Sequence, residues 1–260
     1  MTLNARYFIG DALELLKEDD TEYQAILTDP PYRIGLNGKK SQLRKAFYIE
    51  GLTNDVGSSP DFDIGQYLPL MLERCKPFNM ICFCGEKQLL ELLNWAEKQG
   101  LNWRILTWHK KNPIPFKNNH LLHDTEYIIH CREPGAYFPN DAPWKMLKTY
   151  FVMDSPRREI GRGQIAGKSL EHPCTKPMKI IENLVQICCP VDGHVLDPFA
   201  GSGTTIKAAM KHGRNVTGYD INPKWEPLLR ESCRFTQSSL SFAQNISSSD
   251  ETAVTVQGGK

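Results

Sequence analysis

The residues best suited to chemistry form a short acidic and proline-rich segment, Asp29-Pro30-Pro31-Tyr32. It directly follows an apolar run, and the prolines prevent a strand from continuing. Because they stiffen the backbone, the Asp29 carboxylate and the Pro30 carbonyl can point the same way as two hydrogen-bond acceptors. Two acceptors suit an amine with two N–H donors, and the flat Tyr32 ring suits stacking on a base. Taken alone, these residues are also ordinary choices for a turn.

A second candidate segment, residues 197–205, is a glycine turn between an apolar strand and a helix. Gly201 and Gly203 allow a tight turn and the close approach of a ligand. The following strand ends at Asp220, and an acid there suits the two hydroxyls of a ribose. The third glycine of a dinucleotide-binding pattern is replaced by Ile206, and Asp197 would repel a pyrophosphate. A nucleoside ligand with a cationic amino-acid part is therefore expected here.

Alternating apolar strands and amphipathic helices must position these two segments. We expect strands at 6–10, 23–28, 80–84, 103–108, 126–131, 194–197 and 214–219, and helices at 11–17, 64–75, 87–98, 177–188 and 204–212. This alternation predicts an α/β fold with a mostly parallel sheet that helices cover on both faces, and strands 103–108 and 126–131 are expected to pair. A ligand is expected at the carboxyl ends of the strands, where the strand order reverses.

Three irregular segments interrupt this alternation. Residues 33–60 carry glycines, serines and basic residues without an apolar period, and they are expected to form a long mobile loop. Residues 132–171, punctuated by prolines and glycines, are interpreted as an inserted recognition region, and residues 237–260 as a disordered tail. The remaining chain divides into a half with Asp29, residues 1–131, and a ligand-binding half, residues 172–236.

The net charge of +1 conceals an uneven distribution along the chain. Residues 1–32 hold 2 Lys/Arg against 7 Asp/Glu, residues 33–60 hold 5 against 2, and residues 101–180 hold 13 against 7. Such asymmetry suits a face that approaches a polyanion, although basic loops exposed to solvent explain it equally well.

No apolar run approaches the roughly 20 residues that a membrane span needs, and the first residues lack the features of a signal peptide. A cytoplasmic protein without membrane contact is therefore expected. The cysteine and histidine spacing indicates no metal site.

Together, the two segments resemble the beta class of S-adenosylmethionine-dependent DNA amino-methyltransferases. In that class the Asp-Pro-Pro-Tyr motif comes first, the target-recognition region second and the cofactor loop last, which is the order found here. The resemblance covers most of the chain up to Arg234. It implies a Rossmann-like methyltransferase sheet with an antiparallel edge hairpin, circularly permuted so that the third strand lies at the N-terminus.

The resemblance also implies which residues carry the chemistry. Asp29, Pro30, Pro31 and Tyr32 would be catalytic. S-adenosylmethionine would be bound by Asp220, at the end of the next strand, and by residues of three matching segments: Asp11, His172, Lys176, Asp197, Phe199, Ala200, Gly201, Ser202, Gly203, Thr204 and Thr205. The segment around Lys176 departs from the pattern of the class at Cys174 and Thr175. Basic residues of the loop and of the middle of the chain would contact double-stranded DNA: Lys39, Lys40, Arg44, Lys45, Lys110, Lys111, Arg157 and Arg158.

Within such families an Asp at the first motif position goes mostly with adenine, so Asp29 favours methylation of N6 on an adenine flipped out of the duplex, as in restriction-modification systems. Methylation of cytosine N4 is the nearest alternative. An RNA or protein amide amine is a further one, and a non-catalytic DNA-binding protein of the same fold belongs to another class. Members of the beta class are often homodimers, but the sequence identifies neither a dimer surface nor a partner nuclease.

Overall fold

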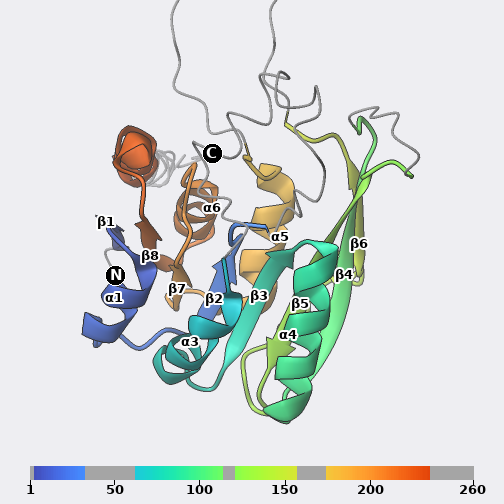
Figure 1. The fold of residues 1–260 in the computed structure, drawn as a ribbon, viewed down its shortest axis with the longest axis horizontal. Coiled ribbons are helices and arrows are strands. Elements are labelled where there is room, and N and C mark those ends of the chain that lie inside the picture. The colour runs from blue at the N-terminus through green and yellow to red at the C-terminus, as the bar shows by residue number, and fades with distance from the viewer. Residues whose placement is uncertain (1–2, 33–61, 114–120, 157–173, 235–260) are drawn as a thin grey trace, which may run out of the picture.

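The computed structural model describes residues 3–32, 62–113, 121–156 and 174–234. Within these ranges one 8-stranded sheet has the order β1-β8-β7-β2-β3-β5-β4-β6 (Figure 1). Its strands are β1 (Ala5–Ile9), β2 (Ala25–Thr28), β3 (Asn79–Cys84), β4 (Asn102–Lys110), β5 (Thr125–Arg132), β6 (Tyr150–Met153), β7 (His194–Asp197) and β8 (Asn215–Asp220). The strands expected from the sequence are all present, with ends that differ by a few residues.

Most of the sheet is parallel, which confirms the predicted fold class. The strands from β1 through β3 in the sheet order pair in parallel, and β5 runs antiparallel to both β3 and β4. The predicted hairpin is thus β4–β5, but β6 pairs in parallel with β4 and forms the edge beyond it. β6 lies within the segment 132–171 that we expected to be irregular. Four residues with alternating exposure are too short a pattern to recognise among prolines and glycines.

Helices cover both faces of the sheet (Figure 1). α5 (Met178–Cys188) and α6 (Thr204–Lys211) pack in one apolar cluster with Leu27 and Phe83. α1 (Ala12–Glu18), α3 (Leu68–Arg74) and α4 (Glu86–Lys98) pack in the other cluster, with Ile26 and Cys82. Because β2 and β3 are covered on both faces, all their residues are buried, as their continuous apolar sequences predict.

The predicted helix 64–75 is divided in the structure. A 3₁₀ turn, η2 (Ile64–Gln66), precedes α3, and the Asp63 side chain accepts a hydrogen bond from the Gly65 N–H group at its start. Pro69 then occupies the first turn of α3, where its missing N–H group needs no partner. The spacing of apolar residues is the same whether residues 64–75 form one helix or two. Pro69 was therefore the only sign in the sequence of the boundary between η2 and α3. A second 3₁₀ turn, η3 (Pro223–Trp225), leads into helical residues 226–234.

The strand order reverses between β2 and β7. These two strands are parallel neighbours, but the chain leaves β2 towards β3 on one side and leaves β7 towards β8 on the other. The ends of β2 and β7 therefore open at the same edge of the sheet, at the point where ligands of such folds bind. The N-terminal strand β1 pairs with β8, next to the C-terminal part of the sheet, as a permuted chain requires.

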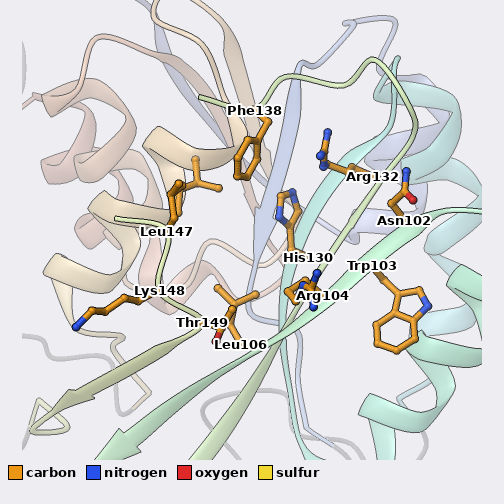
Figure 2. Close-up of a pocket in the computed structure, with 11 residues that line it drawn as sticks. Asn102, Trp103, Arg104, Leu106, His130, Arg132, Phe138, Leu147, Lys148 and Thr149 are labelled. Atoms are coloured by element: carbon orange, nitrogen blue, oxygen red, sulfur yellow. The ribbon is translucent and has the colours of Figure 1, made fainter. Parts of the chain in front are cut away.

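A cavity of about 460 Å³ lies at the opposite end of the sheet (Figure 2). Its walls include His130, Arg104 and Arg132, which share one face of the paired strands β4 and β5. The His130 Nε2 atom and the Asn79 Oδ1 atom are 2.8 Å apart, and the Asn79 amide donates to the carbonyl oxygens of Tyr137 and Cys188. Burial, assisted by Arg132, lowers the pKa of His130 to about 4, so the ring is neutral. Some of the basic residues of segment 101–180 thus lie away from the end of β2.

Several predictions concern residues outside the described ranges. They include the loop 33–60, the tail 237–260 and residues 157–171 of the recognition region. The same holds for some expected site residues: Lys39, Lys40, Arg44, Lys45, Arg157, Arg158 and His172. Among the helices that the structure describes, none is long and apolar enough to cross a membrane.

Two glycines with similar, positive φ angles give a test of the packing around the glycine loop. Gly203 precedes α6 with φ +73°, and an added Cβ would lie 2.8 Å from the Cβ of Ser232. Gly100 has φ +68° and nothing within 4 Å of an added Cβ. Gly100→Ala should therefore cost only the backbone strain, about 1–2 kcal/mol, whereas Gly203→Ala should cost about 1–3 kcal/mol more from the clash. Urea denaturation measures both free energies of unfolding, and equal losses would show that Ser232 does not constrain the loop.

Candidate active site

The two acceptors predicted from the sequence lie directly after β2. The Asp29 side chain is 23% exposed, and its Oδ2 atom forms an ion pair with the Lys176 ammonium. Its Oδ1 atom is buried and accepts no hydrogen bond from the described residues. Within the same ranges, the Pro30 carbonyl oxygen also receives none. Because buried polar atoms are nearly always paired, an unpaired buried oxygen needs an explanation, and a ligand that donates N–H groups provides one.

The backbone of the motif is fixed by Gln88, in the first turn of α4. The Gln88 Nε2 atom donates to the Pro31 carbonyl at 2.8 Å, and its Oε1 atom accepts from the Gly85 N–H group at 3.3 Å. Gln88 is only 2% exposed. We gave it no role from the sequence, although a signal existed, because Gln88 has the four-residue spacing of the buried Leu92 and Ala96. A polar residue on a buried stripe indicates a specific hydrogen-bond partner.

Tyr32 contacts two elements of the site. An added Cβ on Gly85 would lie 3.8 Å from the Tyr32 ring, so the glycine and the ring are close neighbours. The Tyr32 hydroxyl donates to the Glu126 Oε2 atom at 3.2 Å. Burial, together with the nearby Asp29 and Glu126 carboxylates, raises the pKa of Tyr32 well above its ordinary value, so the ring remains a neutral phenol.

Glu126, at the start of β5, links Tyr32 to two lysines. The Lys110 Nζ atom lies 2.6 Å from one Glu126 oxygen, and the Lys176 Nζ atom lies 3.5 Å from the other. Burial alone would raise the pKa of Glu126, but Lys176 and Lys110 outweigh it and lower that pKa. From the sequence we placed Glu126 only at the start of an expected strand, because nothing in the local pattern indicates partners on three other segments.

These contacts bear on three residues predicted from the sequence. The ammonium of Lys110, an expected DNA contact, is paired with Glu126, whereas Lys111 is exposed. Lys176, an expected cofactor contact, lies against the Asp29-to-Tyr32 motif, 5.3 Å from the centre of the Tyr32 ring. The roles assigned to these lysines from the sequence stay predictions.

The glycine loop after β7 lies beside the motif. The Asp197 Oδ1 atom accepts hydrogen bonds from the Thr28 hydroxyl at 3.0 Å and from the Phe199 N–H group at 3.1 Å. Thr28 is the last residue of β2, so this hydrogen bond joins the two predicted segments. Burial raises the pKa of Asp197 to about 7, against the effect of its hydrogen bonds to Thr205, Phe199 and Thr28. A buried acid of this kind is suited to pair with a cation.

Asp220, at the end of β8, holds the loop from the other side. One of its oxygens accepts from the Gly201 N–H group at 2.9 Å and the other from the Asn222 N–H group at 2.8 Å. A carboxylate has further lone pairs beyond these two, so Asp220 retains acceptor capacity. The other predicted loop residues follow β7 in the chain and lead into α6. Ser202 and Thr204 bond each other at 2.8 Å, and Ala200, Thr204 and Thr205 are buried.

Three aromatic rings gather at the loop. Phe199 lies edge-on to Tyr67 and Phe62, with ring centres 5.1 and 5.5 Å away, and Phe62 stacks on Tyr67. The Asp11 carboxylate caps α1 through the Leu13 N–H group, and it also raises the pKa of Tyr67, after the larger effect of burial. Phe62 and Tyr67 had no role in the sequence analysis, because their proximity to Phe199 depends on the tertiary fold. Asp11, Phe199 and the two acids that end β7 and β8 are thus brought to one edge of the sheet.

The sequence and the fold of this chain resemble those of known proteins. Residues 23–231 match the DNA methylase family of N6 and N4 methyltransferases. The Type II methyltransferase M.ScaI of Streptomyces caespitosus is 26% identical over 246 residues, covering 85% of this chain and 78% of the relative. The crystal structure of the M1.HpyAVI–SAM complex superposes with a TM-score of 0.61 at 22% identity, covering 88% of this chain and 98% of the other. The cytosine-N4-specific PvuII DNA methyltransferase superposes with a TM-score of 0.63 at 15% identity, covering 89% and 87%. With a family match over most of its length, this chain belongs to the N6/N4 DNA methylases.

Proposed function

We propose that this DNA methylase transfers a methyl group from S-adenosylmethionine to the N6 atom of an adenine flipped out of duplex DNA. One observation carries the proposal. Two acceptors, the Asp29 Oδ1 atom and the Pro30 carbonyl oxygen, have no partner among the described residues and lie beside the glycine loop after β7. Unpaired acceptors of this kind fit the two N–H groups of an exocyclic amine.

The chemistry of the chain itself is positioning and proton removal. When bound, the cofactor would supply a methyl group that is strongly electrophilic, because the bond to its sulfonium sulfur can break and leave a neutral thioether. Asp29 and Pro30 would hold the two amine hydrogens, so that the nitrogen lone pair remains available for attack, and the Tyr32 ring would stack on the base. The nitrogen must lose one proton after the attack, and the Asp29 carboxylate is the base placed to receive it. The base must leave the duplex first, because its amine cannot reach the methyl group within the stack.

The residues after β7 and β8 fit the cofactor. Asp197, a buried acid beside backbone that turns tightly at Gly201 and Gly203, would pair with the ammonium of the amino-acid part. Asp220 keeps lone pairs for the ribose hydroxyls, and the Phe199 ring, flanked by Tyr67, offers an apolar surface to the adenine. The Asp11 carboxylate, close to Tyr67, would lie at the same end of the ligand.

The choice of adenine over cytosine rests on Asp29, the first residue of the motif. The likeness to the cytosine-N4-specific PvuII enzyme, at 15% identity, concerns the fold alone and does not favour cytosine. DNA incubated with the enzyme and S-adenosylmethionine can be digested to nucleosides and analysed by mass spectrometry. We expect N6-methyladenine, and N4-methylcytosine as the sole product would contradict the adenine assignment while keeping the methyltransferase.

Asp29→Asn should reduce methyl transfer to DNA by at least about 100-fold, because the variant replaces an anionic acceptor and base by a neutral amide. The dissociation constant for S-adenosylmethionine should change little, since Asp197 and Asp220 would hold the cofactor. Transfer of a radioactive methyl group and calorimetric titration measure the two quantities. Asp20→Asn, at an exposed position between α1 and β2, is the matched control. Normal activity in Asp29→Asn would reject the catalytic role.

The affinity for S-adenosylmethionine should increase as the pH rises from 5.5 to 7.5. The pKa of Asp197 is about 7 in the ligand-free protein, so below that pH an ammonium can pair with it only after a proton leaves. The limiting slope is about tenfold in affinity per pH unit below the pKa, and it levels off above. Asp197→Asn should bind more weakly at pH 7.5 and show little pH dependence. The same slope in both proteins would mean that another group is responsible.

A further inference from the structure

Four charged side chains form a continuous row in the candidate active site. They alternate in sign in the order Lys110, Glu126, Lys176 and Asp29. They come from the end of β4, the start of β5, the segment before α5 and the end of β2. Lys176 is the most buried of them, at 9% exposure, and the formal charges sum to zero. A balanced row such as this can be buried at low cost, whereas the loss of one member leaves an uncompensated charge.

Lys176 acts directly on the catalytic carboxylate. Its ammonium is bound to Oδ2 of Asp29, and the buried Oδ1 atom remains without a partner among the described residues. A carboxylate that is held by one oxygen cannot rotate freely about its Cβ–Cγ bond, so the other oxygen keeps a fixed direction. Burial raises the pKa of Asp29, and Lys176 is the main influence that opposes this rise.

Glu126 in turn holds Lys176 in place. One oxygen of Glu126 lies 3.5 Å from the Lys176 ammonium and accepts the Tyr32 hydroxyl at 3.2 Å, while the other pairs with Lys110. The Lys176 ammonium also lies 5.2 Å from the centre of the Phe83 ring and 5.3 Å from that of Tyr32. The same carboxylate therefore fixes both the lysine that binds Asp29 and the ring expected to stack on the base.

We propose that Lys176, held by Glu126, is a positioning residue that keeps Asp29 ionised and leaves its Oδ1 atom free for the target amine. This inference rests on the proposed function and replaces, for Lys176, the expected contact with the cofactor. An ionised carboxylate accepts a stronger hydrogen bond than a protonated one, so Lys176 strengthens the hold on the amine without touching the base.

The pH profile of methyl transfer distinguishes this role from a structural one. Removing an opposite charge next to a carboxylate raises its pKa by about 1–3 units. In the pH profile, kcat falls at low pH as Asp29 takes up a proton, and this fall is the acidic limb. In Lys176→Met the acidic limb should move to higher pH by that amount, and below it kcat should drop about tenfold for each pH unit. The dissociation constant for S-adenosylmethionine should stay within about twofold of the wild type, because a group bound to Asp29 has no direct part in holding the cofactor.

Two further variants complete the experiment. Lys176→Arg keeps the charge and should restore the wild-type limb to a large extent. Lys98→Met changes an exposed lysine at the end of α4 and should leave the profile unchanged. An unshifted limb in Lys176→Met would overturn the proposal, and a large loss of S-adenosylmethionine affinity with an unshifted limb would assign Lys176 to the cofactor instead.

A double variant covers the case in which Lys176→Met folds poorly. Glu126→Gln combined with Lys176→Met restores a zero sum, because Lys110 and Asp29 remain. Its midpoint of thermal unfolding should exceed that of Lys176→Met, and its acidic limb should lie between those of Lys176→Met and the wild type, since Glu126 no longer raises the pKa of Asp29. A double variant with a midpoint no higher and an acidic limb no lower than those of Lys176→Met would show that Glu126 and Lys176 are not coupled, and would overturn the part given to Glu126.

The wild-type enzyme separates failure of this inference from failure of the proposed function. If the wild type methylates adenine in DNA and Asp29→Asn does not, the proposed function stands whatever Lys176→Met does. If the wild type transfers no methyl group to DNA, the proposed function fails, and the inference fails with it.

Discussion

The parallel pairing of β2 with β7 is the constraint on which the site depends. Each strand ends in a segment that could do little alone, a proline-stiffened acid after β2 and a glycine loop after β7. The register Ala25↔Val195 and Ile26↔Leu196 brings the strand ends level, and the Thr28 hydroxyl bonds the Asp197 carboxylate directly. A slip of one residue in either strand would turn the side chains of that strand, Thr28 in β2 or Asp197 in β7, to the other face of the sheet. Because both strands are buried on both faces, the hydrophobic core fixes this register.

The second organising feature is the balance of buried charge. Asp29 and Glu126 are surrounded by Lys176 and Lys110, so the charges are compensated in pairs. The charges are balanced, but the hydrogen-bond acceptors are not all used. One Asp29 oxygen has no partner among the described residues. A folded protein tolerates such an oxygen at some cost in stability, and sites of this kind are typically where a ligand binds. The unpaired Asp29 Oδ1 atom lowers the stability of the fold but suits the binding of a ligand. The surrounding ion pairs limit this loss of stability.

Much of this fold could be predicted from the sequence, because its strands and helices have clear local patterns. The bounds of β7 were predicted without error, and α5 was placed within one residue, with Pro177 at its start. The two motifs were recognised because each is continuous in the chain. Their adjacency could be expected from the alternation of strands and helices, since ligands bind where the order of a parallel sheet reverses.

The remaining part of the site depends on contacts between distant segments. Glu126 meets Tyr32 and Lys176 only because β5 is inserted antiparallel beside β3, and no local period indicates that pairing partner. Phe62 and Tyr67 are ordinary aromatic residues until the fold places them against Phe199. The role of Gln88 could be predicted in part. Its position on a buried helix stripe indicates that it has a hydrogen-bond partner, but not that the partner is the Pro31 carbonyl. Residues that act through another side chain are in general harder to predict than those within a motif.

The central claim is that the Asp29 Oδ1 atom and the Pro30 carbonyl oxygen hold the target amine. A crystal structure of the enzyme with a non-reactive cofactor analogue and a duplex that contains its methylation site tests it most directly. We predict that the target base lies outside the duplex, with its exocyclic nitrogen about 2.7–3.2 Å from both oxygens. A base that lies in the site with its amine bound elsewhere, and with the Asp29 Oδ1 atom still unpaired, would contradict the account.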